Sequence, residues 1–208
     1  MLRVYHASVL PLLGQKGGEG LSRYRREKLN RISDPRAYAL SLGAELLLLA
    51  ALRELGGPMP PLKITCSEAG KPALLGGPVF SLSHSGERIL CALSDEAVGA
   101  DLQQLRPYNP ALARRFFTGA EAAWLEEQRE QNLAFSLLWS LKESYVKFLG
   151  SGIAETHLDS FTVRVLPDGR ARIDGSSVKL WYAICDGYVM AICSHAYAAP
   201  ETVKEWIL

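Results

Sequence analysis

The chain has 208 residues, 48% of them hydrophobic and 22% charged, and a formal net charge of +1 at pH 7. This composition suffices for the core of one large domain or two small ones, whereas the near-neutral charge argues against a general nucleic-acid binder, which carries a strong basic excess. The cysteines Cys66, Cys91, Cys185 and Cys193 lack CxxC spacing, so we expect buried free thiols in a reducing compartment rather than disulfides or a zinc site.

The first elements in chain order are a strand over residues 2–10 and a short charged helix over residues 23–30. Ser-Asp-Pro at residues 33–35 starts a helix well, and the Ala- and Leu-rich residues 36–55 predict the main helix of the first half. Its apolar run 46–52 is too short to cross a membrane, which favours a buried helix. The N-terminus lacks an apolar core with a small-residue cleavage site, so we expect no secretion.

Short strand-like segments separated by glycine-rich turns follow from residue 63 onward. Residues 80–83 and 89–94 flank a Ser-Gly turn and predict a hairpin. Thr118 and Glu121 have the spacing of a capping box, which predicts a helix ending near residue 128. After a longer helix, we expect strands at residues 161–166, 171–173, 178–184 and 189–194.

Residues 184–194 resemble the hairpin at 83–94, which is a weak internal repeat. Helices followed by strands also occur twice along the chain. We therefore predict an α+β fold of two similar α/β lobes, residues 1–105 and 106–208. We place an active-site cleft between the lobes, because pockets form preferentially at such interfaces.

The longer helix, expected to begin with Asn132 as its N-cap and to end at Gly150, contains WSLKESYVK at residues 139–147. Glu143 and Lys147 lie one turn apart on the same face of this helix. An exposed ion pair of this kind contributes only about 0.2–0.5 kcal/mol. Taken alone, the segment favours that plain explanation over a functional site.

A second segment, VGADLQ at residues 98–103, places an acid after Gly-Ala at the end of an apolar run. Gly99 permits the close approach of another backbone, and we expect Asp101 at the tip of a strand. A Gly–small–Asp element, followed some forty residues later by Lys-Glu-Ser with a lysine four beyond the Glu, resembles the paired signature of the 4'-phosphopantetheinyl transferases.

The resemblance continues through residues 70–72, 80–86 and 115–117, in the order found in the larger, surfactin-synthetase-type branch of that family, and covers about residues 22–194. It implies a cytoplasmic, two-lobed monomer that transfers the 4'-phosphopantetheine arm of coenzyme A to a serine of an apo acyl or peptidyl carrier protein and releases 3',5'-ADP. Such carriers serve fatty acid, polyketide or nonribosomal peptide biosynthesis. Neither nucleic acid nor a membrane is implied as a partner.

The resemblance also implies Mg²⁺ as the cofactor, with Asp101, Gln103 and Glu143 as its ligands. The family often has Glu where this chain has Gln103, so one negative charge is lost and we expect weaker magnesium affinity. Glu143, or a metal-bound hydroxide that it orients, is implied as the general base for the serine. Lys147 is implied to stabilise charge on the phosphate oxygens.

Contacts with coenzyme A are implied for residues that also have plainer explanations. His84, flanked by Ser83 just before a glycine turn, and Lys71, in a Gly-Lys-Pro loop, match phosphate-binding positions of the family, as does Lys147. Without the resemblance, His84 is a hydrogen-bonded structural histidine, and Lys71 is an ordinary exposed lysine.

A basic segment that binds the 3'-phosphate of coenzyme A in the family matches Arg25 and Lys28 loosely, and Arg36 could substitute for either. By the plainer explanation, these residues belong to a solvated charged helix.

Residues 114–117, Arg-Arg-Phe-Phe, stand in the part of the chain with which family members engage the carrier protein, whose acidic helix would suit exposed arginines. The plainer explanation makes Phe116 and Phe117 core residues, and we expect that at least one of them is. We expect Trp139 to pack, and Lys142 to face solvent or to support the turn of its helix.

Gln103 leaves a second hypothesis open. The chain could be a catalytically weakened coenzyme A- or nucleotide-binding module that kept the cleft and lost turnover.

Overall fold

The computed structural model describes residues 1–17, 20–58, 60–151, 156–195, 200 and 202–208. These residues form a mixed α+β fold of five α-helices and three β-sheets. The helices are α1 (Arg23–Leu29), α2 (Pro35–Glu54), α3 (Pro110–Phe116), α4 (Gly119–Glu126) and α5 (Gln131–Leu149), with short 3-10 turns η1 (Leu10–Leu12) and η2 (Leu158–Ser160). The strands are β1 (Leu2–Ser8), β2 (Ile64–Cys66), β3 (Pro72–Leu74), β4 (Val79–Ser85), β5 (Arg88–Ser94), β6 (Val98–Gln104), β7 (Val163–Val165), β8 (Arg170–Ile173), β9 (Lys179–Cys185), β10 (Tyr188–Ser194) and β11 (Thr202–Trp206).

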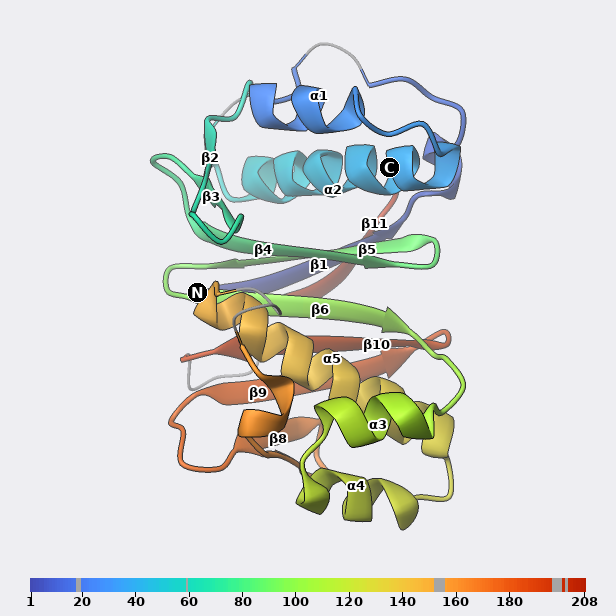
Figure 1. Ribbon diagram of the computed structural model, residues 1–208. Coiled ribbons are helices and arrows are strands. Elements are labelled where there is room, and N and C mark those ends of the chain that lie inside the picture. The colour runs from blue at the N-terminus through green and yellow to red at the C-terminus, as the bar shows by residue number, and fades with distance from the viewer. Residues whose placement is uncertain (18–19, 59, 152–155, 196–199, 201) are drawn as a thin grey trace.

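A four-stranded sheet of order β11-β1-β5-β4 supports the first half of the chain. Helix α2 covers one face of this sheet, and α1 lies on the far side of α2 (Figure 1). The predicted start of α2 is confirmed, because the Asp34 carboxylate accepts a hydrogen bond from the Ala37 amide at 2.7 Å and Pro35 occupies the first turn.

By length and composition alone, α2 is apolar enough to cross a membrane, a test that buried core helices also pass. In this fold, 61% of its most apolar window is buried, and Leu47, Leu48 and Leu52 are fully buried beneath the sheet. The expectation of a buried helix is therefore confirmed.

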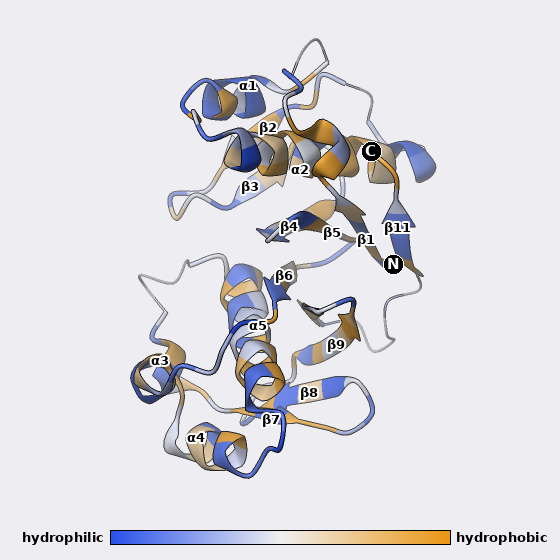
Figure 2. Ribbon diagram, turned by 90° about the vertical axis from the view of Figure 1, so that its right-hand side faces the viewer, coloured by the Kyte–Doolittle hydropathy of each residue, from blue (hydrophilic) through white to orange (hydrophobic). Residues whose placement is uncertain are grey.

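A five-stranded sheet of order β6-β10-β9-β8-β7 supports the second half. Helix α5 crosses one face of this sheet, and α3 lies on the outer side of α5, as Figures 1 and 2 show. The expected strands are present as β8, β9 and β10. Strand β7 is shorter than expected because Leu158–Ser160 forms the turn η2 and the strand itself begins only at Val163.

Serine side chains join the two large sheets where strand β4 of one lies beside strand β6 of the other. The hydroxyl of Ser81 accepts a hydrogen bond from the Ala100 amide at 2.9 Å, and that of Ser85 accepts one from the Gln104 amide at 3.0 Å. Ser83, between them, bonds to a side chain of β6. Side-chain hydroxyls thus satisfy backbone groups along a seam that the β-ladders do not bridge.

The two sheets do not divide the chain at residue 105. Strand β6, which ends at Gln104, pairs with β10 and so belongs to the second sheet. Strand β11, near the C-terminus, returns to pair in parallel with β1 in the first sheet. A boundary between residues 105 and 106 therefore does not follow the hydrogen bonding of the strands.

The predicted ends of α5 are half right. Gly150 ends the helix with φ of 77°, the left-handed conformation that glycine adopts readily. The helix begins at Gln131, however, and Asn132 is not its N-cap. The Asn132 side chain instead accepts a hydrogen bond from the Tyr108 amide at 2.8 Å, so its capping oxygen serves the loop before α3.

The expectation for the cysteines is also half right, although all four are free. Cys91 and Cys193 are buried, and burial raises the pKa of both thiols, as expected of inert residues. Cys66 and Cys185 are exposed. The first lies on the small β2–β3 ribbon, and the second lies at the end of β9 beside a turn.

Candidate active site

Gly99 allows β6 to lie directly against the backbone of α5. A Cβ at this position would overlap the carbonyl oxygen of Ser144 and come within 2.8 Å of the Phe148 Cα. The predicted close approach is therefore confirmed, and it brings the following residues of β6 beside the middle of α5.

Asp101 lies in the middle of β6, buried and opposite Ala191 of β10, and not at a strand tip. The expectation of a tip was wrong because β6 pairs with β10 along its whole length and continues beyond Asp101. Its Oδ1 accepts hydrogen bonds from Lys147 Nζ at 2.7 Å and from the Ser83 hydroxyl at 2.9 Å. Its Oδ2 is buried and has no hydrogen-bond partner among the described residues.

Glu143 lies one turn before Lys147 on α5 and is buried. Burial and then the charge of Asp101 raise the pKa of Glu143 to about 7, although Lys147 and Arg106 oppose the rise. The carboxyl of Glu143 is therefore divided between its neutral and charged forms at neutral pH. A carboxyl with such a pKa can accept or return a proton at physiological pH.

A pocket of about 310 Å³ opens beside these groups. Its walls come from the loop at residues 69–72, from residues 80–82 of β4, and from Glu143, Lys147 and Gly150 of α5. The structure thus brings three of the predicted site residues to one pocket between strand β4 and helix α5.

Lys71, the pocket's loop lysine, directs its ammonium toward the end of α5. Nζ donates hydrogen bonds to the carbonyl oxygens of Lys147, Phe148 and Val98. Its pKa is lowered, chiefly by burial. The three N–H groups are therefore occupied by backbone acceptors, two of them in the last turn of a helix, where a cation is favourable.

His84 lies on β4 within the field of several cations. The residue reaches solvent, but desolvation by the surrounding protein lowers its pKa below the usual value of about 6.5. The cations Lys147, Lys28 and Arg25 lower the pKa further. The carboxylate of Asp101 raises it. Side chains from α1 and α5 thus place positive charge around a histidine of β4.

The two predicted residues of α1 differ in their surroundings. Arg25 is buried, and its guanidinium is paired with the fully buried carboxylate of Glu45 at 3.3 Å, so the expectation of a wholly solvated helix was wrong for this residue. Burial of an arginine requires such a partner. Lys28 is exposed, as expected, and its pKa is lowered by burial of its stem and by Arg25. Arg36 is exposed and pairs with Glu87.

Gln103 follows Asp101 on the same side of β6 and is also buried. Its Nε2 donates hydrogen bonds to Ser85 Oγ at 3.3 Å and to the Gln104 carbonyl at 3.1 Å.

No group of three His, Cys, Asp or Glu side chains that could hold a metal is found within the described part of the chain. Two carboxylates and one amide, with Asp101 Oδ2 left unbonded, nonetheless suit Mg²⁺, which takes oxygen ligands and usually only one or two carboxylates.

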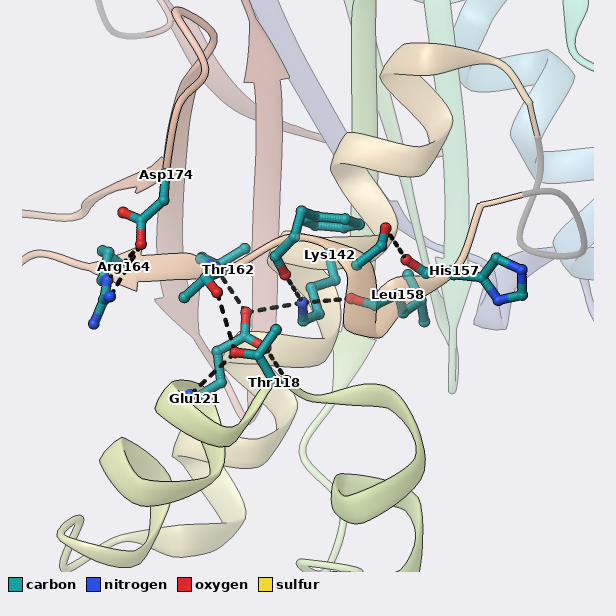
Figure 3. Close-up of polar contacts among 11 residues, drawn as sticks. Thr118, Glu121, Lys142, His157, Leu158, Thr162, Arg164 and Asp174 are labelled. Carbon is teal, nitrogen blue, oxygen red and sulfur yellow. Dashed lines mark hydrogen bonds and ion pairs between the residues drawn. The ribbon is translucent and has the colours of Figure 1, made fainter.

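Lys142 does not face solvent, contrary to expectation. Its ammonium is completely buried and forms an ion pair with Glu121 of α4 at 2.8 Å (Figure 3). The expectation failed because helical periodicity assigns a charged residue to the surface, whereas α5 is enclosed on nearly every side. Its partner, Glu121, is assigned by the sequence only to a capping box. That capping box is present as predicted.

The aromatic residues at the end of α3 belong to the core, as expected of at least one of them. Phe117 is buried, and Phe116 packs edge-on against Trp139 with ring centroids 5.4 Å apart. Trp139 is therefore a packing residue. Arg115 remains exposed. Sequence reasoning missed Arg106, whose charge acts on Glu143, because nothing marks a single arginine in a loop.

Two carboxylates lie beside a pocket that Lys71 and Lys147 line, and Glu143 supplies a group able to exchange protons. This combination suits a phosphate-bearing substrate. Such a site is that of an enzyme of phosphoryl-group chemistry. A family model described as the 4'-phosphopantetheinyl transferase superfamily matches residues 97–193, which include both carboxylates and Lys147.

Similar proteins agree with this match. The chain is 32% identical over 194 residues to the 4'-phosphopantetheinyl transferase Sfp of Bacillus subtilis (strain 168), with 88% of this chain and 86% of Sfp covered. It is 34% identical over 174 residues to the 4'-phosphopantetheinyl transferase psf-1 of Bacillus pumilus, with 79% and 74% covered. A holo-[acyl-carrier-protein] synthase structure from Thermotoga maritima matches with a TM-score of 0.40 and 16% identity, over 47% of this chain and 61% of that one, which is too weak to support a conclusion. The chain belongs to the 4'-phosphopantetheinyl transferase superfamily.

Proposed function

We propose that this enzyme transfers the 4'-phosphopantetheine arm of coenzyme A to a serine of an apo acyl or peptidyl carrier protein and releases 3',5'-ADP. The observation that carries the proposal is that Glu143 and Lys147 line one pocket and that Lys147 is bonded to Asp101 at 2.7 Å, within the segment that matches the family.

In the proposed reaction, the serine oxygen of the carrier attacks the phosphorus atom next to the pantetheine arm. The bond from that phosphorus to the bridging oxygen breaks, and 3',5'-ADP leaves with the bridging oxygen. The serine proton passes to Glu143, the carboxylate on the pocket wall. The ammonium of Lys147, 2.7 Å from Asp101, supplies positive charge for the phosphate oxygens.

Asp101, Gln103 and Glu143 are the residues proposed to hold Mg²⁺. The ion would neutralise charge on the pyrophosphate oxygens. The buried, unbonded Oδ2 of Asp101 supports this assignment, because a buried carboxylate oxygen without a partner is costly unless a ligand satisfies it.

Contacts with coenzyme A are proposed for Lys71 and Lys147 at the pocket, for Ser83 and His84 farther along β4, and for Arg25 and Lys28 at the 3'-phosphate. The cations that act on His84 support a phosphate site here. Four of the six have partners within the protein. Arg25 is paired with a buried carboxylate, and Lys71 would have to release backbone carbonyls to reach a phosphate. Lys147 and Ser83 bond to each other and to Asp101.

The finer architecture is also a proposal. The neighbours β4-β5-β1 in one sheet and β9-β10-β6 in the other have the same order, and a two-residue turn closes each hairpin, which supports two similar lobes with the active-site cleft between them. We further propose that the protein works as a cytoplasmic monomer, without a nucleic-acid or membrane partner.

The test is to incubate the purified protein with coenzyme A, Mg²⁺ and an apo carrier protein, and to measure the mass of the carrier. The expected result is a gain equal to the phosphopantetheine arm with the native protein and none with Asp101→Asn. Binding of coenzyme A without any gain in carrier mass would reject the transferase and favour the binding module instead.

A further inference from the structure

Lys142 and Glu121 form the most completely buried ion pair close to the candidate active site. Both side chains are 0% exposed, and Nζ lies 2.8 Å from Oε1 (Figure 3). Lys142 immediately precedes Glu143, so the two side chains leave α5 about 100° apart around its axis. The pair therefore lies beside the pocket without lining it.

Each polar group of this pair has a partner. The Lys142 ammonium also donates to the carbonyl oxygens of Leu158 and Phe161, both at 2.7 Å, which completes its three donors. Its charge lies 4.2 Å from the centre of the Phe161 ring. These contacts tie α5 to the first residue of η2 and to the residue that follows η2.

Glu121 is equally committed. Oε1 accepts a further hydrogen bond from the Val163 amide at 2.7 Å, and Oε2 accepts one from the Thr118 amide at 2.8 Å, within the capping box of α4. The pair thus connects one turn of α5 with the start of α4 and with Leu158 of η2, as the dashed lines of Figure 3 show. It also bonds to Phe161 after η2 and to Val163, the first residue of β7.

This network restricts the rotation of α5. A helix that slips by one residue turns each side chain by about 100°, which would leave the Lys142 charge buried and unpaired at a cost of about 3–5 kcal/mol. The apolar face of α5 and its close approach to Gly99 favour the same rotation. The buried pair adds a directional constraint on the residue next to Glu143.

Stability alone does not account for the pair. Well-packed apolar residues in place of a buried ion pair are often as stable or more so, and the surrounding aromatic and aliphatic side chains would accommodate them. A directional network is useful where a neighbouring group must be held to a fraction of an ångström.

We propose that Lys142 is a positioning residue for the transfer reaction: through its ion pair with Glu121 it fixes the rotation of α5, so that Glu143 and Lys147 meet Asp101 at the pocket. The inference rests on the proposed function and adds to it a residue that touches neither substrate nor metal.

The test compares four proteins by carrier mass gain over time and by thermal unfolding: the native protein, Lys142→Met, the charge-free double variant Lys142→Met/Glu121→Gln, and Leu138→Ala. In the double variant, Gln retains the capping box, and no buried charge is left unpaired. Leu138, buried one turn before Lys142 and without a polar role, is the control for a general loss of packing.

We expect Lys142→Met to lose stability, and the double variant to recover part of it, because the unpaired buried charge is gone but the carbonyl oxygens of Leu158 and Phe161 still lack their donor. In both, kcat is expected to fall about 10- to 100-fold, with the KM for coenzyme A within twofold of the native value. Leu138→Ala should lose stability but keep kcat within twofold when assayed well below its unfolding temperature. This combination separates positioning from folding.

Native kcat in the stable double variant would overturn the inference and leave the proposed function standing. A rise in KM with an unchanged kcat would overturn it as well, because it would assign the pair to substrate binding. No transfer by the native protein would reject the proposed function, and this inference with it.

Discussion

The carboxylate of Asp101 on β6 helps to raise the pKa of Glu143 on α5 to about 7. Burial of Glu143 is the largest cause of this rise, and the charge of Asp101 is the second. Because the pKa of Glu143 is higher in the fold than its ordinary value of 4.5, the folded protein binds a proton more tightly than the unfolded chain does. This stabilisation is complete below pH 4.5 and is lost as the pH rises through about 7.

Glu143→Gln should therefore stabilise the protein at pH 8 in the absence of divalent metal, by about 1–3 kcal/mol, because Gln resembles the protonated carboxyl. The gain should nearly vanish at pH 4.5, where the native residue is itself protonated. Urea unfolding with a chelator present at the two pH values measures it. Transfer activity should be lost at both. An equal stability difference at the two pH values would contradict the assigned pKa.

Gly99→Ala should separate β6 from α5. The added Cβ would meet backbone atoms of Ser144 and Phe148, which cannot rotate away as a side chain can, so we expect a loss of at least about 3 kcal/mol together with activity. Gly119→Ala, at a helical position with nothing within 4 Å, is the matched control and should be neutral or slightly stabilising. Thermal unfolding of both variants decides the matter; equal unfolding temperatures would show that α5 can move.

The candidate site and the buried Lys142 illustrate how much of the structure the sequence alone predicts. Gly99, Asp101, Glu143 and Lys147 could be placed together because a recognisable spacing carries them, and Gly99 indicated a close approach. The surroundings of Lys142 could not be predicted, because a buried lysine depends on a partner, Glu121, that only the tertiary fold brings near.

Capping residues were predictable to the same limited degree. A local hydrogen bond fixes the start of α2 at Asp34 and the end of α5 at Gly150, so the sequence sufficed. Asn132 was misassigned because its side chain bonds to the Tyr108 amide, 24 positions away in sequence. Strand β11 escaped prediction because its pairing with β1 joins the two ends of the chain.

Gln103→Glu should change the magnesium dependence of transfer. A third carboxylate strengthens a site for a hard cation, so half-maximal activity is expected at a lower Mg²⁺ concentration. Without metal the variant should be less stable by about 1–3 kcal/mol, because a carboxylate cannot donate the hydrogen bond that Gln103 gives to the Gln104 carbonyl. Unaltered magnesium dependence would exclude residue 103 from the metal site.

Lys71→Met should reduce stability by about 1–3 kcal/mol, because the carbonyl oxygens of Lys147, Phe148 and Val98 lose a common donor. If Lys71 also contacts a phosphate, the KM for coenzyme A should rise. Lys63→Met, an exposed lysine in the same region, is the control for both measurements. A loss of stability with an unchanged KM would make Lys71 a helix cap only and remove it from the substrate site.

His84 should report on phosphate binding directly. Its pKa is held below the usual value by desolvation and by the cations Lys147, Lys28 and Arg25. A bound phosphate group would offset that positive charge and favour the imidazolium, so the pKa of His84 should rise when 3',5'-ADP is added. NMR titration of the imidazole with and without the nucleotide measures the shift, with His157, an exposed histidine on another part of the surface, as the internal control. If His84 and His157 respond alike, the nucleotide binds elsewhere and the phosphate site proposed around β4 is wrong.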